Sequence, residues 1–282
     1  MTTDESAAEP VLELTDVTFR RDGKQILDGI SFTVASGEHW ALLGPNGAGK
    51  STILGFCGAV THPTSGTVRV LGGQLGRVEL QALRRMIGHV NPRHPLRSPL
   101  TVREVVLTGI TGTIETPLRW QPKPGQAEHA EQLIDALGLR AKAGDRWPTL
   151  SQGERGRTLI ARALAASPRL LLLDEASTGL DVAAREQLLD TIDMLREAYP
   201  EIASIVVTHH LEDLPASTTH AMLISRGRMV AAGPIDEAVS TATVSRAFEH
   251  PIRVERHDGR WTARAARYPL AADHRPLTEG AA

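Results

Sequence analysis

The sequence has one cysteine, few aromatic residues and almost no net charge, and these shortages exclude several classes of protein. A single cysteine, Cys57, rules out an intramolecular disulfide and suits a reducing compartment, and we expect it to be a buried apolar residue on a helix. A formal net charge of -2 does not favour a nucleic acid or an anionic membrane as the partner of the whole chain. Apolar runs all fall short of the ~20 residues that a transmembrane helix needs. The acidic start MTTDESAAEP is unlike a signal peptide, so we expect any membrane association to depend on a partner.

What the sequence does contain is typical of a globular protein with an α/β fold. Of its 282 residues 41% are hydrophobic and 23% charged, which is enough apolar material for a core. Short strands of half-buried pattern come first, and buried-type strands then alternate with helices, which predicts a largely parallel sheet beside an N-terminal antiparallel β subdomain. The predicted organisation is a disordered leader at 1–10, a main domain at 11–240 with an inserted helical subdomain at about 92–165, and a partly disordered extension at 241–282 that includes a small hairpin.

The clearest motif is GPNGAGKST, which has the spacing G-x-x-x-x-G-K-S. It follows a predicted strand at 40–43 and opens a predicted helix, which is the context of a phosphate-binding loop. The glycines let the backbone N–H groups face the phosphates, Lys50 reaches the β- and γ-phosphates, and the Ser51 hydroxyl binds Mg²⁺. The predicted nucleotide-binding residues are Gly44, Pro45, Asn46, Gly47, Ala48, Gly49, Lys50, Ser51 and Thr52.

Two further segments place polar side chains at the ends of buried strands. LLLLDE ends with Asp174 and Glu175, and IVVTHH ends with His209 and His210. Strand ends of this kind line the ligand-binding edge of a parallel sheet. We expect Asp174 to hold Mg²⁺ through water and Glu175 to polarise the attacking water, with His209 a candidate contact to the γ-phosphate. The alternative for each is a solvated loop residue or a satisfied polar group, which is the role that we expect for His210.

A second anion site is predicted where LSQGE leads into the amphipathic segment RGRTLIARAL. Ser151 and Gly153 are expected in a turn that opens a helix, where free backbone N–H groups and the helix dipole favour an anion. The chain already has a phosphate-binding loop, so the residues by themselves leave open what this second site binds.

The motifs GPNGAGKST, LSQGE, LLLLDEASTGLD and VTHH, in that order, resemble those of ABC-type ATPases, the nucleotide-binding domains of ATP-binding-cassette proteins. The resemblance covers about residues 11–233 and is nearest in character to single-domain bacterial members of the molybdenum-transport or photorepair type. It implies a P-loop NTPase core of the RecA-like type that binds ATP with Mg²⁺. LSQGE resembles the family signature LSGGQ, and in this family each signature contacts the ATP held by a second copy packed head to tail. The residues that would do so here are Ser151, Gln152, Gly153 and Glu154.

Two positions depart from the family pattern. Family members usually carry an aromatic residue near position 21 that stacks on adenine, and here the position holds Arg21, which is either a stacking guanidinium or a solvated turn residue. The glutamine of the loop that touches Mg²⁺ is replaced by Pro92, which has no side-chain acceptor. Either Asn91 or a water substitutes for it, or coupling to the permease differs from that of common importers.

The resemblance also implies partners. A chain with one phosphate-binding loop and one signature is expected to work as a homodimer or with a similar ATPase, beside integral-membrane permease subunits on other chains, at the cytoplasmic face of the membrane. The expected function is ATP hydrolysis coupled to transport of a small solute. A soluble ABC ATPase acting on nucleic acid or the translation machinery is the alternative; the absence of a second cassette and of coiled-coil heptads weighs against it, and Pro92 weighs for it.

A basic cluster lies around the position of Pro92. It is either a solvated face or a docking surface for a permease helix or for phosphates, and the lack of interleaved aromatic residues weighs against single-stranded nucleic acid. The residues are Arg84, Arg85, Arg93, His94, Arg97 and Arg103.

Overall fold

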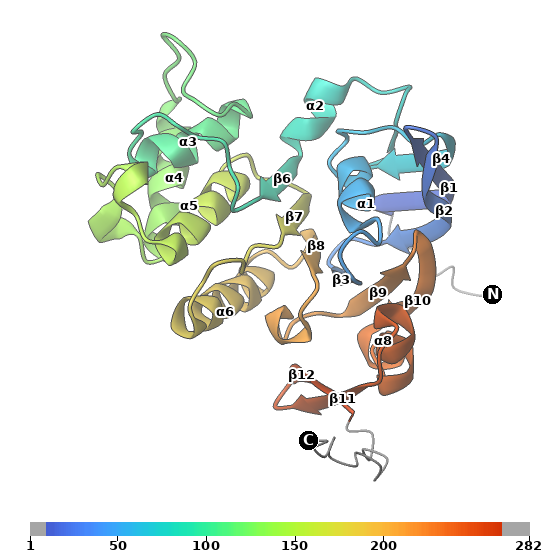
Figure 1. Cartoon of the computed structure of the whole chain (residues 1–282). Coiled ribbons are helices and arrows are strands. Elements are labelled where there is room, and N and C mark those ends of the chain that lie inside the picture. Colours follow the sequence, from blue (N-terminus) through green and yellow to red (C-terminus); the bar gives the residue numbers. More distant parts are fainter. Residues whose placement is uncertain (1–9, 267–282) are drawn as a thin grey trace, which may run out of the picture.

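The structure, a computed structural model, describes residues 10–266, which form two sheets, a helical subdomain and a C-terminal hairpin (Figure 1). The α/β architecture predicted from the sequence, with its antiparallel β subdomain and helical insertion, is confirmed. The expected disordered leader, apart from Pro10, and the expected frayed end after Ala272 lie outside the described residues.

A four-stranded antiparallel sheet forms the N-terminal subdomain, in the order β2-β1-β4-β5. Asp22 and Gly23, at φ 51° and 76°, make the tight turn between the first two strands, as a two-residue hairpin with right-handed twist requires. The segment SGTVRVLG supplies the strand β4, and a two-residue strand β5 follows it. The strands are β1 Leu12–Arg21, β2 Lys24–Val34, β4 Ser65–Val70 and β5 Gly73–Gln74.

The main sheet has six strands in the order β10-β9-β3-β8-β7-β6, and it is parallel except where β10 pairs with β9. Its central strands are covered on both faces, which is why they read as continuous apolar runs rather than alternating ones. Their carboxyl ends meet at one edge, where the candidate site lies. The strands are β3 His39–Leu43, β6 Ile87–Val90, β7 Leu170–Asp174, β8 Ala203–Thr208, β9 His220–Ser225 and β10 Arg228–Pro234.

Helices cover this sheet on both faces and form the separate helical subdomain. Helix α1 packs between the two sheets with Phe56 and Cys57 fully buried, as expected for the cysteine. The helices α3, α4 and α5 group together on the far side of β6 (Figure 1) and share one apolar core with α6. The helices are α1 Lys50–Cys57, α2 Leu80–Arg85, α3 Val102–Thr111, α4 Pro124–Ala136, α5 Gln152–Leu164 and α6 Val182–Ala198.

After the main sheet the chain forms two short helices and a hairpin. The helices α7 Ile235–Ala238 and α8 Thr241–Phe248 precede the antiparallel strands β11 Ile252–His257 and β12 Arg260–Ala265. Trp261 of the hairpin is buried in a cluster with residues of β3 and β9. Within residues 10–266, none of the helices combines the length and the apolar character that a membrane span requires.

Candidate active site

The phosphate-binding loop connects β3 to α1, and its conformation requires glycine at two positions. Gly44 and Gly49 have φ of 153° and 110°. A Cβ on Gly44 would lie 2.2 Å from the carbonyl oxygen of Ile224, and one on Gly49 would lie 2.5 Å from Cδ2 of Leu27. The motif therefore has glycine at two positions where the backbone conformation is left-handed and where a side chain would collide with nearby residues.

Lys50 opens α1 and turns back into this loop. Its Nζ donates hydrogen bonds to the carbonyl oxygens of Gly44 at 2.7 Å and Pro45 at 3.0 Å. Desolvation lowers the pKa of this buried amine, and the nearby charges of Glu175 and Asp174 act in the opposite direction. The charged lysine is thus held at an energetic cost in the free protein, which an arriving phosphate would offset.

A cavity of about 430 Å³ opens beside the loop and brings together five predicted site residues from separate segments. These are Asn46, Ser51, Asp174, Glu175 and His209, and the last three lie at the carboxyl ends of β7 and β8. The remaining lining residues are Asn91, Pro92, Arg93 and Thr178.

Asp174 and Ser51 supply the oxygen atoms that a Mg²⁺ ion would use. Desolvation raises the pKa of Asp174, and Asn91 Nδ2 donates to its Oδ2 at 3.0 Å. Within the described part of the chain, no group of three or more His, Cys, Asp or Glu side chains is placed to hold a metal. One carboxylate and one hydroxyl still fit Mg²⁺, because this ion keeps several waters and takes the rest of its ligands from nucleotide phosphates.

Glu175 has an unusual backbone conformation. Its φ is 49°, a left-handed value that costs a non-glycine residue roughly 1–3 kcal/mol. Its N–H donates to the carbonyl oxygen of Val207 at 3.0 Å, which anchors this turn to β8. The carboxylate lies 3.3 Å from His209 Nδ1 and 4.0 Å from the exposed guanidinium of Arg93. His209 Nδ1 is buried and has no hydrogen-bond partner among the described residues, with the Glu175 carboxylate as its charged neighbour.

The signature segment begins α5. Ser151 Oγ accepts from the N–H of Glu154 at 3.3 Å, and Glu154 Oε2 accepts from the N–H of Ser151 at 2.8 Å, which is a capping box. This bond to the Ser151 backbone is the main reason that the pKa of Glu154 is lowered. Gly153, which was expected in the turn, lies inside the first turn of the helix because Ser151 is the cap.

Several predicted residues do not line the cavity. Of the loop residues 44–52 only two do so, and none of the signature residues 151–154 does. Arg21 ends β1 with its side chain 76% exposed, 3.8 Å from Asp22, and it too lies outside the lining. Sequence reasoning did not place Thr178 and Arg93 in the site; their position next to LLLLDE and to Pro92 is the only signal that could have found them.

Known proteins that are similar to this chain are ATP-binding proteins of ABC transporters. The family model described as ABC transporter matches residues 27–178. The ABC transporter ATP-binding protein YlmA of Bacillus subtilis is 40% identical over 247 residues, covering 86% of this chain and 93% of that protein. The hemin import ATP-binding protein HmuV of Nocardia farcinica is 34% identical over 250 residues, covering 86% and 83%. A dimeric ATP-binding cassette solved in a post-hydrolysis state with ADP and Pi matches with a TM-score of 0.68 and 25% identity, covering 79% and 98%.

The fold and the site thus define a nucleotide-binding ATPase with a phosphate-binding loop at the edge of a parallel sheet. The chain belongs to the ABC transporter ATP-binding family. It is an ATP-binding and ATP-hydrolysing subunit of an ABC transporter, as the resemblance implied, and the alternative of a soluble ATPase acting on nucleic acid or ribosomes is not favoured.

Proposed function

We propose that this chain hydrolyses Mg-ATP at a site that two copies complete together, and that closure of this dimer drives a separate permease. The observation that carries the proposal is the division of the motifs between two places. The cavity is lined by Asn46 and Ser51 of the phosphate-binding loop together with Asp174, Glu175 and His209, and the capped start of α5 is not part of that lining. In a dimer, the start of α5 in one copy would complete the cavity of the other copy, and the reverse.

Each residue around the cavity has a proposed role. Lys50 binds the β- and γ-phosphates, and Ser51 and Asp174 hold Mg²⁺, the latter through water. Glu175 is the general base for the attacking water, and His209 holds the γ-phosphate and that water. The loop residues 44–52 bind the phosphates through their N–H groups, and Arg21 stacks on the adenine ring. Asn91 takes the place of the missing loop glutamine, since its amide already contacts Asp174 at 3.0 Å.

The signature is proposed to bind the ATP of the second copy. Ser151, Gln152, Gly153 and Glu154 form the cap and first turn of a 13-residue helix, whose early N–H groups have no intrahelical acceptor. The matched cassette with ADP and Pi is itself a dimer, which supports the same arrangement here.

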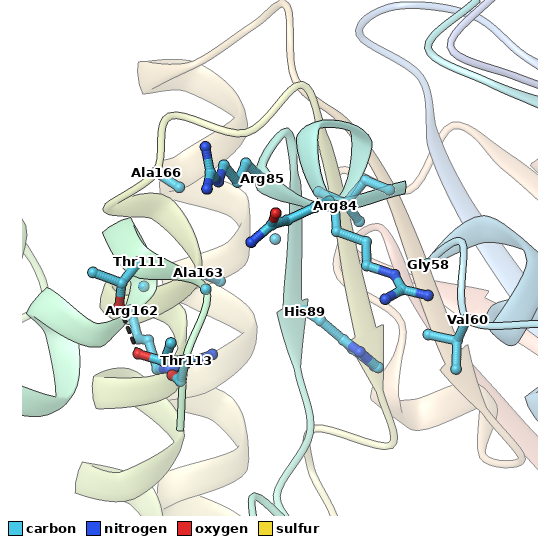
Figure 2. A pocket seen from close by; sticks show the side chains of 15 residues that line it. Gly58, Val60, Arg84, Arg85, His89, Thr111, Thr113, Arg162, Ala163 and Ala166 are labelled. Carbon is cyan, nitrogen blue, oxygen red and sulfur yellow. Dashed lines mark hydrogen bonds between the residues drawn. The ribbon is translucent and has the colours of Figure 1, made fainter. Parts of the chain in front are cut away.

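The partner of this dimer is proposed to be a permease that docks between α2, β6 and the helical subdomain. A cavity of about 360 Å³ lies there, with Arg84, Arg85, His89 and Arg162 among its lining and no acidic residue (Figure 2). Arg162 is largely desolvated, which lowers its pKa, and its guanidinium donates only to neutral oxygens of Thr108 and Thr113. Such a surface favours a partner segment that carries a carboxylate.

Docking there would place the protein on the cytoplasmic face of the membrane through its partner. The relative HmuV is an import protein for hemin, which supports import of a small solute as the direction of transport.

A trapped complex tests this proposal. Glu175→Gln protein, tagged and isolated from its native host with Mg-ATP present throughout, should retain the closed dimer together with a multi-spanning membrane protein. The matched control is the double variant Glu175→Gln, Ser151→Arg, which should lose the dimer. Recovery of ribosomes or nucleic acid in place of a membrane protein would contradict the transport role.

A further inference from the structure

The C-terminal hairpin lies outside the segment matched by the family model, yet it contacts the part of the chain that follows His209. Arg260, the first residue of β12, bridges two elements. Its Nη1 donates to Glu186 Oε2 on α6 at 2.7 Å, and its Nη2 donates to the carbonyl oxygen of Glu212 at 2.9 Å. The N–H of Ala263 donates in turn to Glu212 Oε1 at 3.0 Å. Both the main chain and the side chain of Glu212 are therefore held by β12.

Glu212 belongs to a single 3-10 turn, Leu211–Asp213, that starts two residues after His209. The same turn is held from the opposite side by the buried carboxylate of Asp213. Its Oδ2 accepts hydrogen bonds from Ser177 Oγ at 2.7 Å and from Thr208 Oγ1 at 3.0 Å. Leu211 packs in one apolar cluster with Trp261 of the hairpin. The turn after His209 is thus fixed by contacts on both of its sides.

These contacts link four segments in a closed ring: the connection from Glu175 to α6, α6 itself, the hairpin, and the turn after His209. Ser177 lies in the connection that starts at Glu175 and ends at Asp181, the N-cap of α6. Glu186 is one turn further along α6 and receives Arg260, which returns to the turn after His209. Without Arg260 the ring would be open between α6 and that turn, although the bond from Ser177 would remain. Figure 1 shows β12 next to the turn that follows β8, below α6.

We propose that Arg260 is a positioning residue for ATP hydrolysis: it holds the turn 211–213 against α6 and so keeps His209 at 3.3 Å from Glu175. The inference rests on the proposed function, from which it takes the roles of His209 and Glu175. Glu186 is suited to this contact because its hydrogen bond with Arg260 lowers its pKa and keeps the carboxylate charged. Charge-assisted bonds of this kind are shorter and more directional than neutral ones. Arg260 itself is 27% exposed, so water competes with the contact only in part.

The variants that test this role differ in what they leave in place. In Arg260→Ala we expect kcat to fall about tenfold with the KM for ATP changed less than about twofold, because the bonds of Arg260 go to Glu186 and Glu212 and not to the phosphate-binding loop. Arg260→Lys should recover part of kcat, since an ammonium keeps the charge but does not reproduce the fork that reaches both acceptors. Arg253→Ala is the matched control, because Arg253 lies on the same hairpin, 73% exposed, and pairs with Glu255 two residues away. It should have wild-type kinetics.

A double-mutant cycle with His209→Ala separates positioning from general stability. If Arg260 acts through His209, Arg260→Ala should lower kcat about tenfold in the wild-type background and less than twofold in the His209→Ala background. An equal loss in both backgrounds, or a loss that follows the fall in melting temperature and that Arg260→Lys does not relieve, would overturn the inference. If His209→Ala alone leaves kcat unchanged, the proposed catalytic role of His209 is wrong. An equal loss in both backgrounds instead refutes only the positioning role of Arg260.

Discussion

Replacing Lys50 by alanine should strongly weaken ATP binding while changing the stability of the free protein little. The Nζ of Lys50 is buried and bonded to two loop carbonyls, yet desolvation lowers its pKa, which means that its charge is held at a cost. Alanine removes that cost together with the two hydrogen bonds. These effects oppose each other, so we expect a free-protein melting temperature close to that of the wild type.

The loss in ATP affinity can be estimated from the same contacts. A charge-assisted hydrogen bond contributes roughly 1.5–3 kcal/mol, and Lys50 is the one cation that the phosphate-binding loop itself supplies. A loss of about 3 kcal/mol corresponds to a Kd for Mg-ATP about 150-fold higher. Titration calorimetry in the Glu175→Gln background, where ATP persists, measures this Kd directly. Lys24→Ala is the matched control, because Lys24 is an exposed lysine at the start of β2.

Two results would refute this reasoning. A Kd within about threefold of that of Glu175→Gln alone would show that the lysine does not reach the phosphates. Hydrolysis near the wild-type rate by Lys50→Ala would remove the assignment of the phosphate-binding loop itself.

Three further predictions concern the loop, the pH dependence of stability and the docking surface. Gly49→Ala should abolish nucleotide binding and lower the melting temperature, because φ at this position is 110° and the new Cβ would lie 2.5 Å from Leu27 Cδ2. Unchanged nucleotide binding would contradict this prediction. Burial lowers the pKa of His39 to about 4, so the unfolded state takes up this proton first and stability is lost as the pH falls below about 6.5. When the pH is lowered from about 7.5 to about 5.0, the free energy of unfolding of the wild type should therefore fall about 2 kcal/mol more than that of His39→Gln. Glutamine can keep the bond to Ser204 but does not titrate. Urea titrations at the two pH values measure the fall, and equal falls in the two proteins would contradict this. Arg85→Glu should reduce co-purification of the permease without changing the ATPase rate of the free protein, and retention of the permease would count against this surface.

The sequence predicted the local parts of the site and could not predict the contacts that join them. The phosphate-binding loop depends on a strand, a glycine-dependent turn and a helix that follow one another, so nine residues indicate it. Asp174 and His209 were placed at one edge because both end apolar runs of the kind that form buried parallel strands. The bonds of Lys50 to its own loop, and of Asn91 to Asp174, depend on side-chain geometry over which sequence spacing has no control.

Two details of the fold also lay beyond the sequence. β4 ends at Val70 because Leu71 and Gly72, at φ 51° and 79°, make a tight turn, and the strand β5 that follows has only two residues. The hairpin near residue 258 was readable from its turn, whereas its contact with the segment after His209 was not. Arg260 and Glu212 are 48 residues apart, and no periodic pattern connects them.

Mixing two inactive variants tests the shared site most directly. In a head-to-tail dimer each site uses Lys50 from one copy and Ser151 from the other, so Lys50→Ala and Ser151→Arg damage different halves of a site. The account predicts that each variant alone is inactive and that an equal mixture recovers ATPase activity, because a mixed dimer contains one intact site, made of Lys50 from the Ser151→Arg copy and Ser151 from the Lys50→Ala copy. A mixture no more active than its components, or a Ser151→Arg protein that hydrolyses ATP at the wild-type rate, would contradict the central claim that two copies complete the site.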